Sequence, residues 1–203
     1  MEKTDLKKDM KAFYQPSAKA FSIVDLPEMQ FVSVEGQGAP EGAAFSDAVQ
    51  WLYSVVYPMK FMAKKHYGKD FVAPPLEGLW WSQDWTDFSA GRRDRWQWRM
   101  MLAVPHWVEA RLFEEAAAKA EAKLGARPDS LGLAPFHEGL SVQIMHIGPY
   151  EDEAPVIARM HDDFMPAQGL KPRGVHHEIY LSDPRRVVPE KLRTVLRQPV
   201  EAV

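Results

Sequence analysis

Two glutamates stand in strand-like segments beside aromatic residues, where carboxylates can take part in acid–base chemistry. The first is Glu178, in the segment HHEIYLSD over residues 176–183. Because side chains alternate along a strand, Glu178 shares a face with His176 and Tyr180, while His177 faces the other way. On an exposed face the carboxylate is an ordinary surface group. On a buried face an ionised carboxylate needs a partner or a function, and the tyrosine on the same face favours this second interpretation.

Glu77 is the second glutamate of interest. It precedes Leu79 and Trp81 on the same face of a short predicted strand. It is equally well explained as a loop residue beside Pro75. Two carboxylates together with tyrosines can serve general acid–base catalysis, but the sequence does not show whether Glu77 and Glu178 converge.

Large apolar side chains are frequent, with seven Trp, ten Phe, six Tyr and ten Met among 203 residues. Such residues fill cores more often than they line pockets, and their division between the two stays open. Tyr53 and Tyr57 lie one helical turn apart, and the tyrosine hydroxyl makes them better pocket candidates than the tryptophans. An aromatic box with a carboxylate suits flat or cationic apolar molecules. The candidate ligand-binding residues are Tyr53, Tyr57, Glu77, Trp80, Trp81, Trp98, Met101 and Tyr150.

Composition and motifs argue against several other functions. The chain has no cysteine, and its histidines lack the spacing of zinc ligands, so we expect no metal site. The glycine-rich phosphate loop, the P-loop lysine and the G-x-S-x-G elbow are missing, so no cofactor is predicted. A net charge of -3 without a basic tract gives no sign of nucleic acid binding. Neither a membrane-spanning apolar run nor a secretory signal is present, so the expected location is the cytoplasm.

The order of predicted elements repeats once along the chain. The first repeat covers about residues 29–104. It comprises strands over 29–35, 77–83 and 96–104, with a helix that opens at Pro40 after the first strand. Pro58 falls inside the helical pattern and is expected to kink or end the helix near Tyr57. A connecting helix follows over about 106–125, with apolar residues every four positions and Gly125 as its stop.

The second repeat covers about residues 139–201. It comprises strands over 140–147, 176–182 and 194–200, with a helix over 151–165 after the first strand. One such repeat cannot bury both faces of its sheet, so we expect the two copies to pack together with a ligand cleft between them. The predicted fold is α+β, a single domain over 1–203 built from a duplicated strand-helix-strand-strand repeat with antiparallel sheets.

Several strings taken together resemble the GyrI-like small-molecule-binding family, and the resemblance extends from about Leu26 onward. The strings are LY-x-x-x-Y (52–57), P-LEGLWW (75–81), W-x-W-x-MM (96–101), VQIMHIGPY-x-x-E (142–153) and HHEIYLSDPRR (176–186). The resemblance implies the same duplicated fold. One departure is the segment Gly36–Pro40, where relatives often have an acidic residue before the proline.

The resemblance also implies a site. In the ligand-binding domains of multidrug-responsive regulators of this family, a buried glutamate in an aromatic pocket meets cationic apolar drugs, and Glu178 looks like its counterpart. No helix-turn-helix precedes the domain, so a stand-alone member is implied. Some stand-alone members hydrolyse strained cyclopropane rings of DNA-alkylating compounds. By that resemblance Glu178 activates water, and Tyr180, Tyr53 or Tyr57 donates a hydrogen bond to the oxygen that gains charge.

Two functional hypotheses therefore stay open. In one, the protein is a hydrolase of electrophilic aromatic xenobiotics, with Glu178 and Tyr180 as its catalytic residues. In the other, it is a non-catalytic module that binds or sequesters such molecules for a separate partner. Both predict a small-molecule ligand for a monomer or homodimer, because a carboxylate beside aromatic rings serves either purpose.

Overall fold

The computed structural model describes residues 3–84 and 86–203. The chain divides into two compact units. The first unit comprises Met1–Asp9, Met29–Pro74 and Trp80–Phe136, and the second comprises Met10–Glu28, Pro75–Leu79 and His137–Val203. The unit boundaries fall within three strands, β2 (Ser22–Gln37), β4 (Leu76–Trp81) and β6 (Gly132–Ile147), each of which supplies residues to both units.

The element order confirms the predicted α+β class and its duplicated repeat. The first repeat is β2 (Ser22–Gln37), α3 (Ala43–Tyr67), β4 (Leu76–Trp81) and β5 (Gln97–Val104). The second is β6 (Gly132–Ile147), a helical segment, β8 (His176–Tyr180) and β9 (Arg193–Ala202). That segment consists of α6 (Ala154–Ala158), η3 (Arg159–Phe164) and α7 (Met165–Ala167). The other elements are β1 (Lys3–Thr4), α1 (Leu6–Asp9), α2 (Lys11–Tyr14), β3 (Asp70–Phe71), α4 (Thr86–Ser89), η1 (Arg93–Arg95), α5 (Ala110–Leu124), η2 (Tyr150–Asp152), β7 (Leu170–Pro172) and η4 (Pro189–Lys191).

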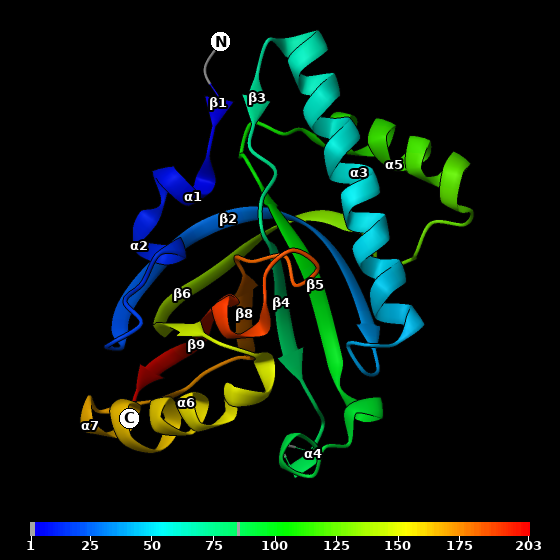
Figure 1. The fold of residues 1–203 in the computed structure, drawn as a ribbon. Coiled ribbons are helices and arrows are strands. Elements are labelled where there is room, and N and C mark those ends of the chain that lie inside the picture. Colours follow the sequence, from blue (N-terminus) through cyan, green and yellow to red (C-terminus); the bar gives the residue numbers. More distant parts are fainter. Residues whose placement is uncertain (1–2, 85) are drawn as a thin grey trace. The chain divides into compact units, whose positions relative to one another are not determined.

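In the first unit, β2 runs antiparallel to β5 in a register that extends from Gln30 opposite Val104 to Gln37 opposite Gln97. Helix α3 packs beside α5, the connecting helix between the repeats (Figure 1). Of the two alternatives predicted for Pro58, an end of the helix near Tyr57 is excluded, because α3 continues through Pro58 to Tyr67. Its buried stripe extends past the proline, and this burial outweighs the one backbone hydrogen bond that Pro58 cannot donate.

In the second unit, β9 is the common partner of three strands. It pairs in antiparallel fashion with β6, β8 and β7. Apolar side chains of β6, η3, α7 and β9 form one core cluster, whose buried members are Val142, Ile144, Met160, Met165, Leu196 and Val200. The predicted helix over 151–165 is present, although its centre, η3, has the wider turns of a π-helix.

The side chains of β8 alternate between two faces as the sequence predicts, although His176, on the face of Glu178, is buried as well. His177 and Ile179 are fully buried, whereas Glu178 and Tyr180 are half-buried on the opposite face. Of the helices in the described ranges, none combines the length and apolar character that crossing a membrane requires.

A candidate ligand site around Glu178

Glu178 sits on the half-buried face of β8 between two polar neighbours from its own strand. The hydroxyl of Tyr180 donates a 2.7 Å hydrogen bond to Glu178 Oε2, and His176 Nε2 lies 3.3 Å from Oε1. The Glu178 side chain retains 16% of its exposure. Its carboxylate is therefore oriented by the protein and is still within reach of a molecule from solvent.

The turn η2 adds an aromatic ring and a second carboxyl group to this region. Its backbone closes with a hydrogen bond from Glu153 N to Tyr150 O, and the Tyr150 ring packs edge-on against Tyr180, with centroids 5.8 Å apart. Burial, followed by the negative charge of Glu178, raises the pKa of Glu153 to about 9. Burial and the same carboxylates raise the pKa of Tyr150 to about 12. These effects favour the protonated form of Glu153, and a hydrogen bond with Thr194 acts in the opposite direction.

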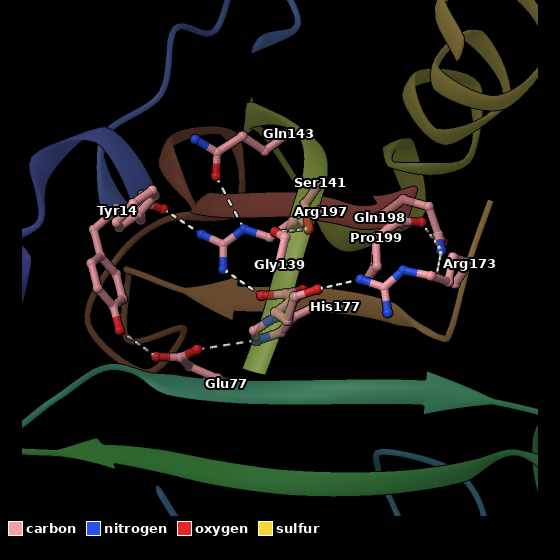
Figure 2. Close-up of polar contacts among 12 residues, drawn as sticks. Tyr14, Glu77, Gly139, Ser141, Gln143, Arg173, His177, Arg197, Gln198 and Pro199 are labelled. Atoms are coloured by element: carbon pink, nitrogen blue, oxygen red, sulfur yellow. Dashed lines mark hydrogen bonds and ion pairs between the residues drawn. The ribbon is translucent and has the colours of Figure 1, made fainter. Parts of the chain in front are cut away.

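A separate polar network lies in the interior of the second unit, on the other face of β8 (Figure 2). The imidazole of His177 lies between two carboxylates, with Nε2 3.0 Å from Glu77 Oε2 and Nδ1 2.9 Å from Glu138 Oε1. Arg197 donates to the other oxygen of Glu138 at 3.0 Å, and Tyr14 donates to the other oxygen of Glu77 at 2.8 Å. All four oxygens of the two carboxylates are thus engaged.

Opposite charges keep this buried network ionised. Burial opposes the charged form of His177, but the charges of Glu138 and Glu77 outweigh it and raise the His177 pKa to about 9. Burial also opposes ionisation of Glu138, and His177 and Arg197 overcome it and lower the Glu138 pKa to about 2. Two carboxylates therefore balance one imidazolium and one guanidinium, which is how buried charges are tolerated.

The network also forms hydrogen bonds with α2, in the N-terminal segment of the second unit. Arg197 donates to the backbone carbonyl of Phe13 at 2.6 Å, and Gln143 donates to that of Ala12 at 2.6 Å. Together with the Tyr14 hydroxyl, these contacts join α2 to β4, β6, β8 and β9. The structure therefore separates the two glutamates singled out in the sequence, because Glu77 belongs to this network and Glu178 faces away from it.

The remaining predicted ligand-binding residues lie in the first unit. On α3, the rings of Tyr53 and Tyr57 pack against each other in a tilted arrangement with centroids 5.9 Å apart, and Tyr57 is exposed. The Trp81 indole donates to Gln97 at 2.6 Å and is half-buried. Trp80, Trp98 and Met101 are buried in the core, where Phe45 packs against the first two.

Sequence and structure comparisons place the chain among known proteins. The model of the GyrI-like small molecule binding domain matches residues 19–201, which is most of the chain. This protein belongs to that family. Among solved structures, a Listeria innocua protein described as an uncharacterized conserved protein is 41% identical, over 98% of this chain and 100% of that one, with a TM-score of 0.87. A comparison with curated proteins gave no significant match.

Two other solved structures extend the comparison of this GyrI-like chain. A Listeria innocua structure described as a hydrolase is 40% identical over 98% of this chain and 100% of that chain, with a TM-score of 0.85. The C-terminal domain of EcmrR has the same fold at 12% identity, over 91% of this chain and 98% of that domain, with a TM-score of 0.58. The likeness to EcmrR concerns the fold alone.

Three buried residues of the regions described above were not singled out from the sequence of this family member. Glu153 lies within the string VQIMHIGPY-x-x-E, but nothing in its spacing indicates that its side chain is buried. Glu138 and Arg197 belong to β6 and β9, which are far apart in the sequence. The fold brings both residues close to His177. A separate hollow of about 260 Å³ in the first unit contains none of the predicted site residues, and Thr4, Lys69, Asp70, His106 and Trp107 line it. Within the described ranges, no cluster of His, Asp and Glu has the arrangement of a metal site.

Proposed function

We propose that this protein binds a flat aromatic cation through Glu178. The observation that carries the proposal is a carboxylate that accepts a hydrogen bond from Tyr180, whose ring packs edge-on against the Tyr150 ring, with 16% of the Glu178 side chain still exposed. An opposite charge within a few ångströms stabilises a cation, and aromatic faces attract it further. A partly desolvated carboxylate with two tyrosine rings beside it therefore favours cations over neutral aromatics.

Glu178 suits this role better than Glu77 does. Both oxygens of Glu77 already have partners, Tyr14 and His177, and its side chain is only 1% exposed. A ligand would have to break a buried charge network to reach Glu77. The free energy lost in breaking that network exceeds the free energy gained from one ligand contact. In the first unit, Tyr53, Tyr57 and Trp81 reach the surface and remain candidate ligand contacts. Trp80, Trp98 and Met101 are better suited to supporting the core.

A fluorescence titration tests the proposal. N-methyl-4-phenylpyridinium carries a fixed positive charge, and 4-phenylpyridine, which is uncharged at alkaline pH, is its neutral counterpart. We expect saturable binding of the cation, and we expect Glu178→Gln to weaken it by about tenfold or more while changing binding of the neutral compound little. Glu190→Gln, which removes an exposed glutamate, is the matched control. Equal effects of Glu178→Gln on both compounds would count against the proposal.

A second candidate function is hydrolysis, which is favoured by the related structures described as hydrolases at 39–40% identity. We propose a strained electrophilic ring as the substrate, on the family resemblance described above. In such a reaction a water oxygen bonds to a ring carbon, the strained carbon–carbon bond breaks, and its electron pair moves to a conjugated carbonyl that takes up a proton. Glu178 would accept the water proton, and Tyr180 would donate a hydrogen bond to the oxygen that gains charge.

Product analysis separates hydrolysis from binding. Incubation with a cyclopropane-bearing alkylating agent is expected to give the ring-opened water adduct, and Glu178→Gln is expected to lose about a hundredfold or more in rate. If the wild type and the variant consume the reagent equally, the hydrolase candidate fails. If the reagent is bound and recovered intact, the protein is a binding module.

A further inference from the structure

His176 is a buried imidazole next to the carboxylate assigned to the ligand. Its side chain is 9% exposed, and its Nε2 atom lies 3.3 Å from Glu178 Oε1, within the range of an ion pair. Among the described residues, neither ring nitrogen of His176 has an aligned hydrogen-bond partner. His177 differs, because both of its ring nitrogens lie within 3.0 Å of a carboxylate oxygen. Glu178 is therefore the carboxylate that a proton on His176 faces.

A second imidazole, His161 of η3, lies near enough to feel the charge of His176. Burial, followed by that charge, lowers the pKa of His161, and Asp162 acts in the opposite direction. The two imidazoles thus compete for a proton. His176 has the advantage of a carboxylate at 3.3 Å, which attracts a positively charged ring.

The other groups around this pair come from several elements. Leu196 and Thr194 of β9 lie opposite Glu178 and Tyr180, so on this face those two positions of β9 add no charge. Arg197 lies opposite His177 and pairs with Glu138 on the other face. The remaining groups that act on Glu178 or its neighbours are Tyr150 and Glu151 of η2, Glu153 after η2, Tyr180 of β8 and Asp183 after β8. These remaining groups are acids and tyrosines, whereas the two imidazoles can gain a positive charge.

We propose that His176 sets the charge selectivity of the Glu178 site by competing with the ligand for the carboxylate. The inference rests on the proposed function, because it requires a cation that contacts Glu178. A neutral imidazole leaves the negative charge of Glu178 to the ligand. A protonated imidazole places a positive ring 3.3 Å from the same carboxylate, which neutralises the pair and repels a second cation. His176 acts through Glu178 and does not have to touch the ligand.

Linkage gives the sign of the pH effect. Histidine is the side chain whose charge ordinarily changes between about pH 5 and 8. Because the cation binds the form with a neutral His176, binding to the protonated form expels a proton, and affinity for the cation rises as the pH rises. The increase is at most about tenfold per pH unit for one proton, and it ends once His176 is neutral in the free protein. A neutral ligand lacks this dependence.

A fluorescence titration at about pH 5.5 and about pH 8 tests the inference. N-methyl-4-phenylpyridinium is charged at both pH values, and 4-phenylpyridine N-oxide is uncharged at both. We expect the affinity of the wild type for the cation to be about tenfold lower at the acidic pH, and that of His176→Gln to change by less than about twofold, because glutamine takes no proton. His161→Gln and His137→Gln, which removes an exposed histidine of the same unit, are expected to keep the wild-type dependence.

The outcomes separate this inference from the function on which it rests. Cation binding with the same affinity at both pH values would overturn the role of His176 and leave the ligand site intact. A pH dependence that persists in His176→Gln, or an equal dependence for the neutral N-oxide, would also overturn it. Absence of cation binding at both pH values would overturn both proposals.

If His176→Gln fails to fold, a proton count decides the question. Calorimetry of cation binding at about pH 6, in two buffers with different heats of ionisation, gives the number of protons released. We expect the release of about 0.3–1 proton per cation in the wild type and in His161→Gln. Equal heats in the two buffers, or a release that disappears in His161→Gln, would overturn the role of His176.

Discussion

Glu178 and His177 are neighbours in the sequence with opposite surroundings, because successive side chains of a strand point to opposite faces. Both ring nitrogens of His177 lie within 3.0 Å of a carboxylate oxygen, and this fixes the backbone of β8 from its buried side. Glu178, on the other face, is then oriented by Tyr180. We therefore propose that His177 positions the strand and that Glu178, which keeps part of its exposure, contacts the ligand.

At the residue scale, Glu153 is a group whose burial lowers stability. Its pKa rises from 4.5 to about 9 on folding, so the unfolded chain ionises it and the folded chain does not. Stability is therefore lost as the pH rises from about 4.5 towards 9. Because glutamine cannot ionise, we expect Glu153→Gln to gain on the order of 1 kcal/mol at about pH 8, or about 2–4 °C in Tm.

Thermal melts at two pH values check this prediction. The gain of Glu153→Gln over the wild type is expected to shrink at about pH 5, where the wild-type carboxyl is largely protonated in both states. Asp152→Asn serves as the control, since that side chain is exposed. A loss of stability in Glu153→Gln at alkaline pH would show that the carboxyl is ionised and paired.

At the element scale, β2 approaches the Trp98 indole so closely that residue 36 has no room for a side chain. A Cβ built on Gly36 would lie 2.2 Å from a carbon of that ring. Trp98 is buried and cannot swing aside without opening the core. We expect Gly36→Ala to cost about 1–3 kcal/mol in the free energy of unfolding, measured by urea denaturation.

Gly132 provides the control for this strand contact. It lies in β6, and no heavy atom is within 4 Å of the position that a Cβ would take there. Gly132→Ala is expected to change stability by less than about 0.5 kcal/mol. Equal effects of the two substitutions would mean that the cost at residue 36 does not come from the Trp98 ring.

Local periodicity in the sequence predicted the elements and singled out Glu178, but it did not predict the buried network around His177. The helix-strand-strand order of each repeat follows from apolar spacing and glycine turns, and the alternation in β8 placed Glu178 and His177 correctly. At Pro58 the sequence left a kink and a helix end open, and the end is excluded because burial continues along α3 beyond the proline. The partners of His177 are Glu77 and Glu138, which belong to strands far apart in the sequence. No local sequence pattern shows that these strands bring the three side chains together.

The buried network joins these elements through its polar contacts. Replacing His177 at its centre is therefore expected to lower the free energy of unfolding. His177→Gln leaves two buried carboxylates without their imidazolium, and we expect a loss of about 3–5 kcal/mol in the free energy of unfolding. His137→Gln, which changes an exposed histidine, is expected to stay within about 0.5 kcal/mol. A loss below about 1 kcal/mol in His177→Gln would contradict the charged state assigned to the network.

At the scale of the whole molecule, the shifted pKa values predict a stability optimum on the acidic side of neutrality. The pKa of Glu138 is lowered from 4.5 to about 2, so its contribution is present above about pH 4.5 and lost as the pH falls through 2. The pKa of His177 is raised from 6.5 to about 9, so its contribution is present below about pH 6.5 and lost as the pH rises through 9. Glu153 adds to the alkaline decline.

Urea denaturation across this range checks the optimum. We expect the free energy of unfolding to be greater at about pH 5.5 than at about pH 8.5, and we expect the difference to shrink in both His177→Gln and Glu153→Gln. A wild-type stability that keeps rising above pH 7 would contradict these assignments.

The central claim, that Glu178 meets the ligand, is tested most directly by a crystal structure with N-methyl-4-phenylpyridinium bound. The pyridinium ring is expected within about 6 Å of the Glu178 carboxylate and of the Tyr150 or Tyr180 ring. A cation found only elsewhere, for example in the hollow beside Trp107, with Glu178 unchanged and free of contact, would contradict the claim.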